Sequence, residues 1–341
     1  MRKSRPFAAY TSTEVMDLKK RALLPMLLCM VLLILDSRCA AQSARDALDL
    51  CIRTLIPSLF PMFVLSAMLV PQLSGIRLPW LGRLLGIPEG SEGLFLLGCA
   101  GGFPVGAACI VQAVGSGGLG REDARRMLGI CSFCGPAFLF GILGPLFSIR
   151  EAGLIFLIQL ETAFLTALFF PVSPGSAIRT KGMDPVSLPE GVKRAAGAMV
   201  SVCAWVTLAG VAAGFLRRWL APMLPLTTSV ALTGLMELTN GIFAMSELPR
   251  ELQFVLCAVF VCFGGVSVLL QIAGFAAGAG IGMGQCVAQK ALQGLLGGIL
   301  GAGVAVFGPW FLLWGIALPA AKIAVEISGR MVYNGPRKEG I

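Results

Sequence analysis

The sequence predicts an all-α polytopic membrane protein with about eight transmembrane helices and two re-entrant hairpins in an inverted repeat. The first observation is composition. The chain of 341 residues is 56% hydrophobic and 13% charged, whereas a soluble domain averages about 25% charged residues. The second is a set of long runs without Asp, Glu, Lys or Arg, and the third is a pair of interrupted apolar stretches. The uncharged runs are 127–149, 195–216, 252–289 and 291–321.

These runs are long enough to cross a bilayer, because spanning the hydrocarbon takes about 20 apolar residues in a helix. A transmembrane β-barrel would alternate apolar and polar residues in segments of about ten, and the sequence has no such alternation. Gly308 and Pro309 divide the last run into a pair of helices. The helices expected, in chain order, are 22–37, 54–71, 127–149, 152–171, 195–216, 252–274, 291–307 and 309–327.

The net charge of +9 describes membrane topology, because Lys and Arg are concentrated in cytoplasmic loops. Counting these residues places both termini and the loop 172–194 in the cytoplasm. Arg217 and Arg218 fall on the outer side and are the main misfit. Basic residues lie scattered between apolar spans, so no nucleic-acid partner is expected.

The N-terminal region has two readings. Basic residues precede the apolar segment 22–35, and a small-residue stretch follows it, which is the order of a signal peptide. Asp36 and Arg38 stand where a neutral cleavage region is expected, which favours a retained helix. Residues 38–53 are expected to form an amphipathic surface segment.

A repeated order of segments organises the chain. Residues 54–149 and 195–274 each contain a helix, an interrupted segment, a charged cluster and an uninterrupted helix, and their first helices cross in opposite directions. Such inverted repeats recur in transporters, where the interrupted segments mark the binding site. The predicted divisions are 1–53 (basic segment, first helix and amphipathic segment), 54–171 (first repeat and following helix), 172–194 (cytoplasmic loop), 195–276 (second repeat) and 277–341 (helix pair and basic tail).

The first interruption is the sequence Gly-Gly-Phe-Pro within 96–120. Glycine and proline there break the helix and leave backbone groups free, which lipid does not tolerate unless protein or a water-filled cavity covers them. Gln112 would lie about two turns further along a following helix. The alternative is close helix packing through Gly102 and Gly106, which form a small-xxx-small pair.

The second interruption, 232–245, places a carboxylate and two other polar side chains beside a glycine in an apolar run. An intramembrane carboxylate predicts a functional site, so Glu237 is the leading candidate, with Thr239 and Asn240 beside it. The alternative is that Glu237 lies at the interface or pairs structurally. In the helices that follow, Ser132, Ser267 and Gln271 could hydrogen-bond across the bundle or serve packing alone.

Enzymatic chemistry is not expected. Histidine is absent, which excludes Ser-His-Asp triads, Cys-His dyads and histidine metal sites. Most of the 11 cysteines lie in apolar runs and predict no disulfide framework, while the lone Cys131–Cys134 pair is weak support for redox or metal chemistry. No nucleophile–base pair is identifiable, and neither a cofactor nor a metal is expected.

Several of these motifs together resemble the YlbJ family of sporulation integral membrane proteins, which are built on nucleoside-recognition, or Gate, domains. The resemblance covers about residues 50–275 and rests on the order and spacing of the motifs. Related Gate proteins often carry a histidine after the Gly-Gly-x-Ser-Val element, where this chain has Leu269, so the resemblance does not extend to a role that needs an imidazole. The motifs are IPSLFPMFVLSAML (56–69), GGFPVGA (101–107), REDARRMLGICSFCGPAFLFG (121–141), TGLMELTNGI (233–242) and FGGVSVLLQ (263–271).

The resemblance implies a transporter-like protein of spore formation in a bacterial cell membrane or forespore membrane. It also adds Gly135 and Pro136, which match the family's Gly-Pro element. We expect a small solute to be bound or moved between the hairpins. The alternative is a non-transporting scaffold for sporulation. The bilayer, the solute and a coupling ion carried by Glu237 are the expected partners, with a homo-oligomer left open. The expected substrate-binding residues are Gly101, Gly102, Phe103, Pro104, Gly106, Gln112, Ser132, Gly135, Pro136, Glu237, Thr239, Asn240, Gly241, Ser267 and Gln271.

Overall fold

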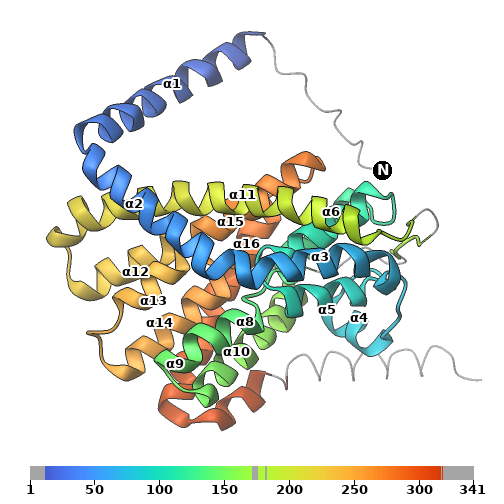
Figure 1. Cartoon of the computed structure of the whole chain (residues 1–341). Coiled ribbons are helices and arrows are strands. Elements are labelled where there is room, and N and C mark those ends of the chain that lie inside the picture. The colour runs from blue at the N-terminus through green and yellow to red at the C-terminus, as the bar shows by residue number, and fades with distance from the viewer. Residues whose placement is uncertain (1–11, 171–175, 181–182, 316, 318–341) are drawn as a thin grey trace, which may run out of the picture.

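The computed structural model describes residues 12–170, 176–180, 183–315 and 317, and every regular element in this part of the chain is a helix. The predicted all-α class is therefore confirmed (Figure 1). The α-helices are α1 (Ser12–Leu35), α2 (Ser37–Leu50), α3 (Ile56–Leu73), α4 (Pro79–Leu85), α5 (Glu92–Gly101), α6 (Val105–Gly115), α7 (Arg121–Ile130), α8 (Pro136–Phe138), α9 (Gly144–Leu146), α10 (Ile149–Phe169), α11 (Leu188–Phe215), α12 (Leu226–Met236), α13 (Leu238–Ala244), α14 (Arg250–Phe263), α15 (Gly265–Gly278) and α16 (Gly284–Phe307).

Helices long and apolar enough to cross a membrane identify the chain as an integral membrane protein. Within the described residues, five helical segments meet this requirement by length and composition. Spanning the hydrocarbon takes about 20 residues, and each segment reaches that length. The segments are Ser37–Leu73, Ile149–Phe169, Leu188–Met223, Arg250–Gly278 and Gly284–Phe307.

Three of the eight expected helices are missing from this set, each for a separate reason. The apolar part of α1 runs only from Leu23 to Leu35, and Figure 1 shows α1 pointing away from the other helices. The expected helix 127–149 is broken at residues 131–135. The expected helix 309–327 lies largely outside the described residues.

The segment 38–53, expected on the surface, belongs to a longer helix. Helix α2 continues through a π-helical turn, Cys51–Leu55, into α3. One face of α2 is buried against α11, where Ser43 and Ala47 lie opposite Gly214 and Gly210. Small residues four apart on both helices let the backbones approach closely, which is a common way to pack helices in lipid.

Two short helical hairpins interrupt the long helices. Helices α5 and α6 fold back on each other at Gly102–Pro104, and α12 and α13 do so at Glu237. In each hairpin a pair of glycines marks the closest approach: Gly98 with Gly106, and Gly234 with Gly241. Gly106 and Gly241 therefore pack the two arms of each hairpin together, and Gly106 does so against Gly98 rather than as a pair with Gly102 on one helix.

Both helices expected to be uninterrupted are broken. The chain leaves α7 at Ile130, runs without helix through 131–135, and re-enters helix at Pro136. The second break is a single residue, Gly264, which separates α14 from α15 with a φ of +87°. Only glycine adopts this left-handed backbone readily, so the residue type sets the place of the break.

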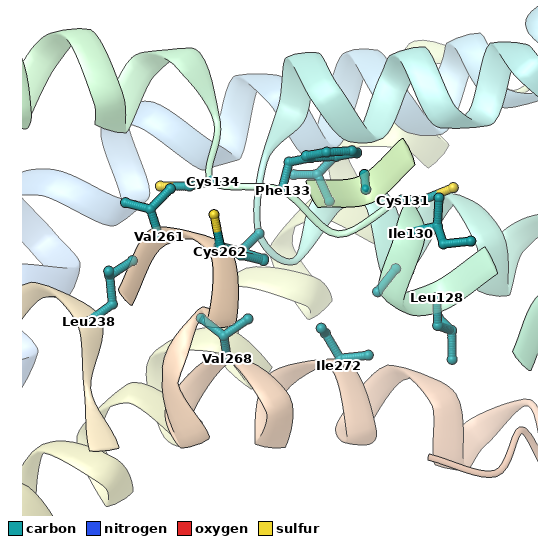
Figure 2. Packing of buried hydrophobic residues seen from close by; sticks show 14 of the residues in the cluster. Leu128, Ile130, Cys131, Phe133, Cys134, Leu238, Val261, Cys262, Val268 and Ile272 are labelled. Atoms are coloured by element: carbon teal, nitrogen blue, oxygen red, sulfur yellow. The ribbon is translucent and has the colours of Figure 1, made fainter. Parts of the chain in front are cut away.

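The first break is enclosed by apolar side chains. Figure 2 shows the segment that carries Cys131, Phe133 and Cys134 passing close to side chains from α14 and α15. Phe133 is 1% exposed, and its ring meets the Phe95 ring edge-on with centroids 5.3 Å apart. Apolar packing therefore holds this non-helical segment inside protein rather than in lipid.

We predict that Gly106→Ala destabilises the folded protein by about 1–3 kcal/mol, as expected for overpacking. A Cβ on Gly106 would overlap with the carbonyl oxygen of Cys131. Gly115→Ala, on the same helix, is the matched control, because nothing lies within 4 Å of a Cβ there. Thermal unfolding of the two detergent-purified variants checks this, and equal melting temperatures would contradict it.

Candidate solute site

The two hairpin tips and the two helix breaks meet at one place. Gly102, at the first tip, has a φ of +77°, and a Cβ on it would lie 2.6 Å from the amide nitrogen of Gly135 in the first break. The amide nitrogen of Leu238, at the second tip, lies 3.3 Å from the corresponding position on Gly265. The Phe103 ring joins the two halves, 3.0 Å from the Cβ position of Gly264.

A cavity of about 450 Å³ opens beside this meeting point. Its walls come from the turn before α3 and the first half of α3, both hairpin tips, the first break with α8, and the middle of α11 and α15. A volume of 300–1,000 Å³ is typical of small-molecule sites. Most of the lining is apolar, and the polar groups are few enough to orient one ligand.

About half of the expected site residues line this cavity. They are Gly101, Gly102, Phe103, Gly135, Glu237, Thr239 and Gln271. Four other expected residues do not line it. Pro104 precedes α6, and Pro136 begins α8. The Ser132 hydroxyl donates to the Leu128 carbonyl, and the Ser267 hydroxyl accepts from Gln271. Ser132 and Ser267 thus make local hydrogen bonds within their own segments, as the packing alternative expected.

Glu237 has a structural role as well as a place in the cavity wall. Its Oε2 accepts from the amide of Asn240 at 2.7 Å, which caps the N-terminus of α13. The residue is 6% exposed and borders both the main cavity and an adjoining cavity of about 260 Å³. Asn240 lines only the adjoining cavity. The carboxylate therefore stands where the two spaces meet.

Arginines surround the adjoining cavity and the surface beyond it. Arg53 lines both the main and the adjoining cavity and pairs with Asp49, with Nε and Oδ1 2.5 Å apart. Arg217 lines the adjoining cavity, and Arg218 pairs with Asp36 at 2.6 Å. These are the two arginines that fit the positive-inside rule poorly: Arg217 lines a cavity, and Arg218 forms an ion pair.

The first break depends on Gln159, a residue that sequence reasoning missed. Gln159 lies on α10 and is 1% exposed. Its Oε1 accepts from the amide of Cys134 at 2.7 Å, and its Nε2 donates to the Cys134 carbonyl at 3.1 Å. One side chain thereby replaces both backbone hydrogen bonds that the missing helical turn would have made. A glutamine inside the apolar helix 152–171 was the available signal.

A second group of missed residues lies on α16. Gln289 and Gln293 are buried and donate to the carbonyls of Arg126 and Gly129 near the end of α7, at 2.9 and 3.1 Å. Lys290, between them, is also buried and donates to the Ser132 carbonyl at 3.1 Å. The expected helix 291–307 in fact begins at Gly284, so Lys290 belongs to its interior.

Gln112 marks a separate cavity. Its Nε2 donates to the carbonyl of Ala67 at 2.9 Å, and it lines a space of about 510 Å³ rather than the cavity at the hairpin tips. Helices α3, α11 and α15 line both cavities in succession. Phe63 and Phe275 both line the cavity of Gln112, and their rings stack with centroids 6.1 Å apart.

Comparisons of the chain with protein-family models, curated proteins and solved structures give no match. The chemistry of the cavity is therefore the guide to function.

We predict that Gln159→Leu loosens the first break, because it leaves the buried Cys134 amide and carbonyl unpaired at about 1–3 kcal/mol per group. Leu157→Ala is the control, since Leu157 lies on the same helix but is 50% exposed. Thermal unfolding and amide hydrogen exchange over 131–135 measure the effect. Faster exchange in the leucine variant alone supports the bridging role, and unchanged exchange contradicts it.

Proposed function

We propose that the protein is a transporter-like membrane protein that binds a small solute between its two hairpins and carries it across the bilayer. The observation that carries the proposal is the meeting of two hairpin tips and two helix breaks at one cavity bordered by Glu237. Transporters of inverted-repeat design place discontinuous helices at the substrate site in the same manner. The proposal includes the resemblance to YlbJ-type sporulation proteins, a bacterial cell or forespore membrane, and cytoplasmic termini.

The order of elements supports two repeats of opposite topology with hairpins that enter and leave on one side. Helix α3 precedes the first hairpin as α11 precedes the second. Helix α7 and its break correspond to α14 and its break. Each tip packs on the break of its own repeat, Gly102 on Gly135 and Leu238 on Gly265. Two equivalent halves around one cavity are what alternating access requires.

The cavities lie in succession, which supports passage of a solute. The adjoining cavity shares Ser43, Asp46 and Arg217 with a more open space of about 950 Å³ bordered by α2 and α11. Glu237 links the adjoining cavity to the main one. Beyond the Phe63–Phe275 pair lies the cavity of Gln112. In this proposal the two stacked rings, which line that cavity, form the barrier to the solute.

The main cavity favours a small solute with an apolar body and hydrogen-bonding groups at one end. Phe103, Phe138 and Val268 supply apolar surface. Glu237, Thr239 and Gln271 supply acceptors and donors on the side of the second repeat. Nucleosides have this character, which agrees with the nucleoside-recognition domains of the family that the sequence resembles.

We predict that Glu237→Gln lowers solute uptake about tenfold or more while the protein stays folded, because the amide keeps an acceptor for the α13 cap but loses the charge. Uptake is measured in liposomes with a panel of nucleosides, small carboxylates and metal ions. Glu190→Gln is the control, because Glu190 is exposed and pairs with Arg194 away from the cavity.

Two outcomes would overturn the transport proposal. One is a wild-type protein that is folded in liposomes yet neither moves nor binds any member of the panel, together with a Glu237→Gln strain that sporulates normally. The other is uptake that Glu237→Gln and Glu190→Gln reduce equally. The first outcome would favour the non-transporting scaffold.

We predict that replacing both Phe63 and Phe275 by alanine opens a leak between the two cavities, because the proposal assigns the barrier to these stacked rings. The expected result is solute flux that no longer saturates. The control replaces Phe307 and Phe311, a stacked pair elsewhere in the fold whose rings lie 5.7 Å apart. Saturable flux in both double variants would contradict the barrier.

A further inference from the structure

Helix α16 buries a lysine side chain behind the wall of the main cavity. Lys290 is 0% exposed. Its ammonium donates to the Ser132 carbonyl at 3.1 Å and to Gln293 Oε1 at 2.7 Å. The nitrogen also lies 4.9 Å from the centroid of the Phe103 ring, at the tip of the first hairpin. One cation thus contacts the first break, α16 and the hairpin tip.

The surroundings of this ammonium contain no neutralising carboxylate. No ion pair joins Lys290 to an acidic residue in the part of the chain that the structure describes. The acceptors of its ammonium are the Ser132 carbonyl and Gln293 Oε1. An unpaired buried charge is strongly unfavourable unless other groups compensate for it. The compensating groups here are oxygen dipoles and an aromatic face.

The C-terminal end of α7 explains why a cation is favourable at this place. The last carbonyls of a helix carry a partial negative charge, and the break at 131–135 leaves α7 without a continuing turn. Gln289 and Gln293 satisfy two carbonyls of α7, and Lys290 satisfies the Ser132 carbonyl just beyond it. Gln289, Lys290 and Gln293, which lie on one face of α16, therefore cap the broken end.

Backbone carbonyls at the end of a half-helix, an amide oxygen and the face of an aromatic ring are also ligands for a free cation. Transporters with broken helices coordinate their coupling Na⁺ through unwound carbonyls and half-helix C-terminal ends. At the first break of this chain, those ligands surround a side-chain ammonium. A free monovalent cation and the ammonium would compete for the same oxygen atoms.

We propose that the Lys290 ammonium is a tethered replacement for a coupling cation, and that it holds the first hairpin tip against the break of α7 without Na⁺. The consequence for transport rests on the proposed function, whereas the occupancy of the cation site does not. A tethered cation cannot leave with the solute. Solute movement through this half of the protein is therefore independent of a sodium gradient, and Phe103 links the ammonium to the cavity wall.

The test removes the ammonium in two ways and offers free cations instead. Lys290→Ala removes the side chain and leaves room beside the carbonyls, so that Na⁺ or methylammonium can enter. Lys290→Met removes the charge but fills the space and is the matched control. Melting temperatures of the detergent-purified proteins are measured in NaCl, LiCl, methylammonium chloride and N-methylglucamine chloride at equal ionic strength, without solute.

The expected result is a wild-type melting temperature that is the same in all four salts. The alanine variant should melt lower and recover about 3 °C or more, saturably, in Na⁺ or methylammonium, while the methionine variant recovers nothing. Saturable, Na⁺-specific stabilisation of the wild type would overturn the proposal. So would an alanine variant that responds to no cation or a methionine variant that responds equally.

If neither variant folds, saturable, Na⁺-specific stabilisation of the wild type still overturns the proposal. Failure of uptake in liposomes would contradict the transport proposal, but it would not change the expected salt dependence of these melting temperatures. The two proposals are therefore separately refutable.

Discussion

The structure depends on satisfying backbone groups where helices stop inside an apolar protein. Lipid offers no hydrogen-bond partner, so each interruption has to be paired by the protein itself. Gln159 pairs both groups of Cys134, Glu237 caps α13, and Lys290 holds the Ser132 carbonyl. These polar side chains come from different helices, so the interruptions also fix how the helices pack around them. The cavity exists because four such interruptions lie together.

Glycine makes this arrangement sterically feasible. Gly102 and Gly135 bring the first hairpin tip and the first break into backbone contact, and a side chain on either would fill the space that the other occupies. The Gly98–Gly106 and Gly234–Gly241 pairs do the same within the hairpins. The close approach of these backbones leaves no room for lipid between them. It places the hairpin tips beside a cavity whose lining contains few polar side chains. Gly102 and Gly135 therefore serve the packing and also line the cavity.

The sequence predicts the apolar helical class and the helix interruptions at Gly102–Pro104 and at Glu237, because uncharged length, Gly-Phe-Pro and a carboxylate in an apolar run are local signals. The breaks at 131–135 and Gly264 were missed, since Pro136 and single glycines also occur inside membrane helices. Lys290 separates two apolar runs in the sequence, but it lies within α16 because the Ser132 carbonyl, just beyond α7, accepts from its ammonium. The Gln112 side chain lines another cavity, because the packing of α6 on α3 brings its amide to the Ala67 carbonyl.

The central claim is that the interruptions face a water-accessible cavity and not lipid. Cysteine labelling tests it most directly, in a chain whose 11 native cysteines are replaced by alanine. Ala137 lines the main cavity, whereas Phe140, on the same short helical segment, is 42% exposed and does not line it. We expect a charged, membrane-impermeant thiol reagent to modify Ala137→Cys and to leave Phe140→Cys unmodified. Modification of Phe140→Cys alone, or of neither, would contradict the claim.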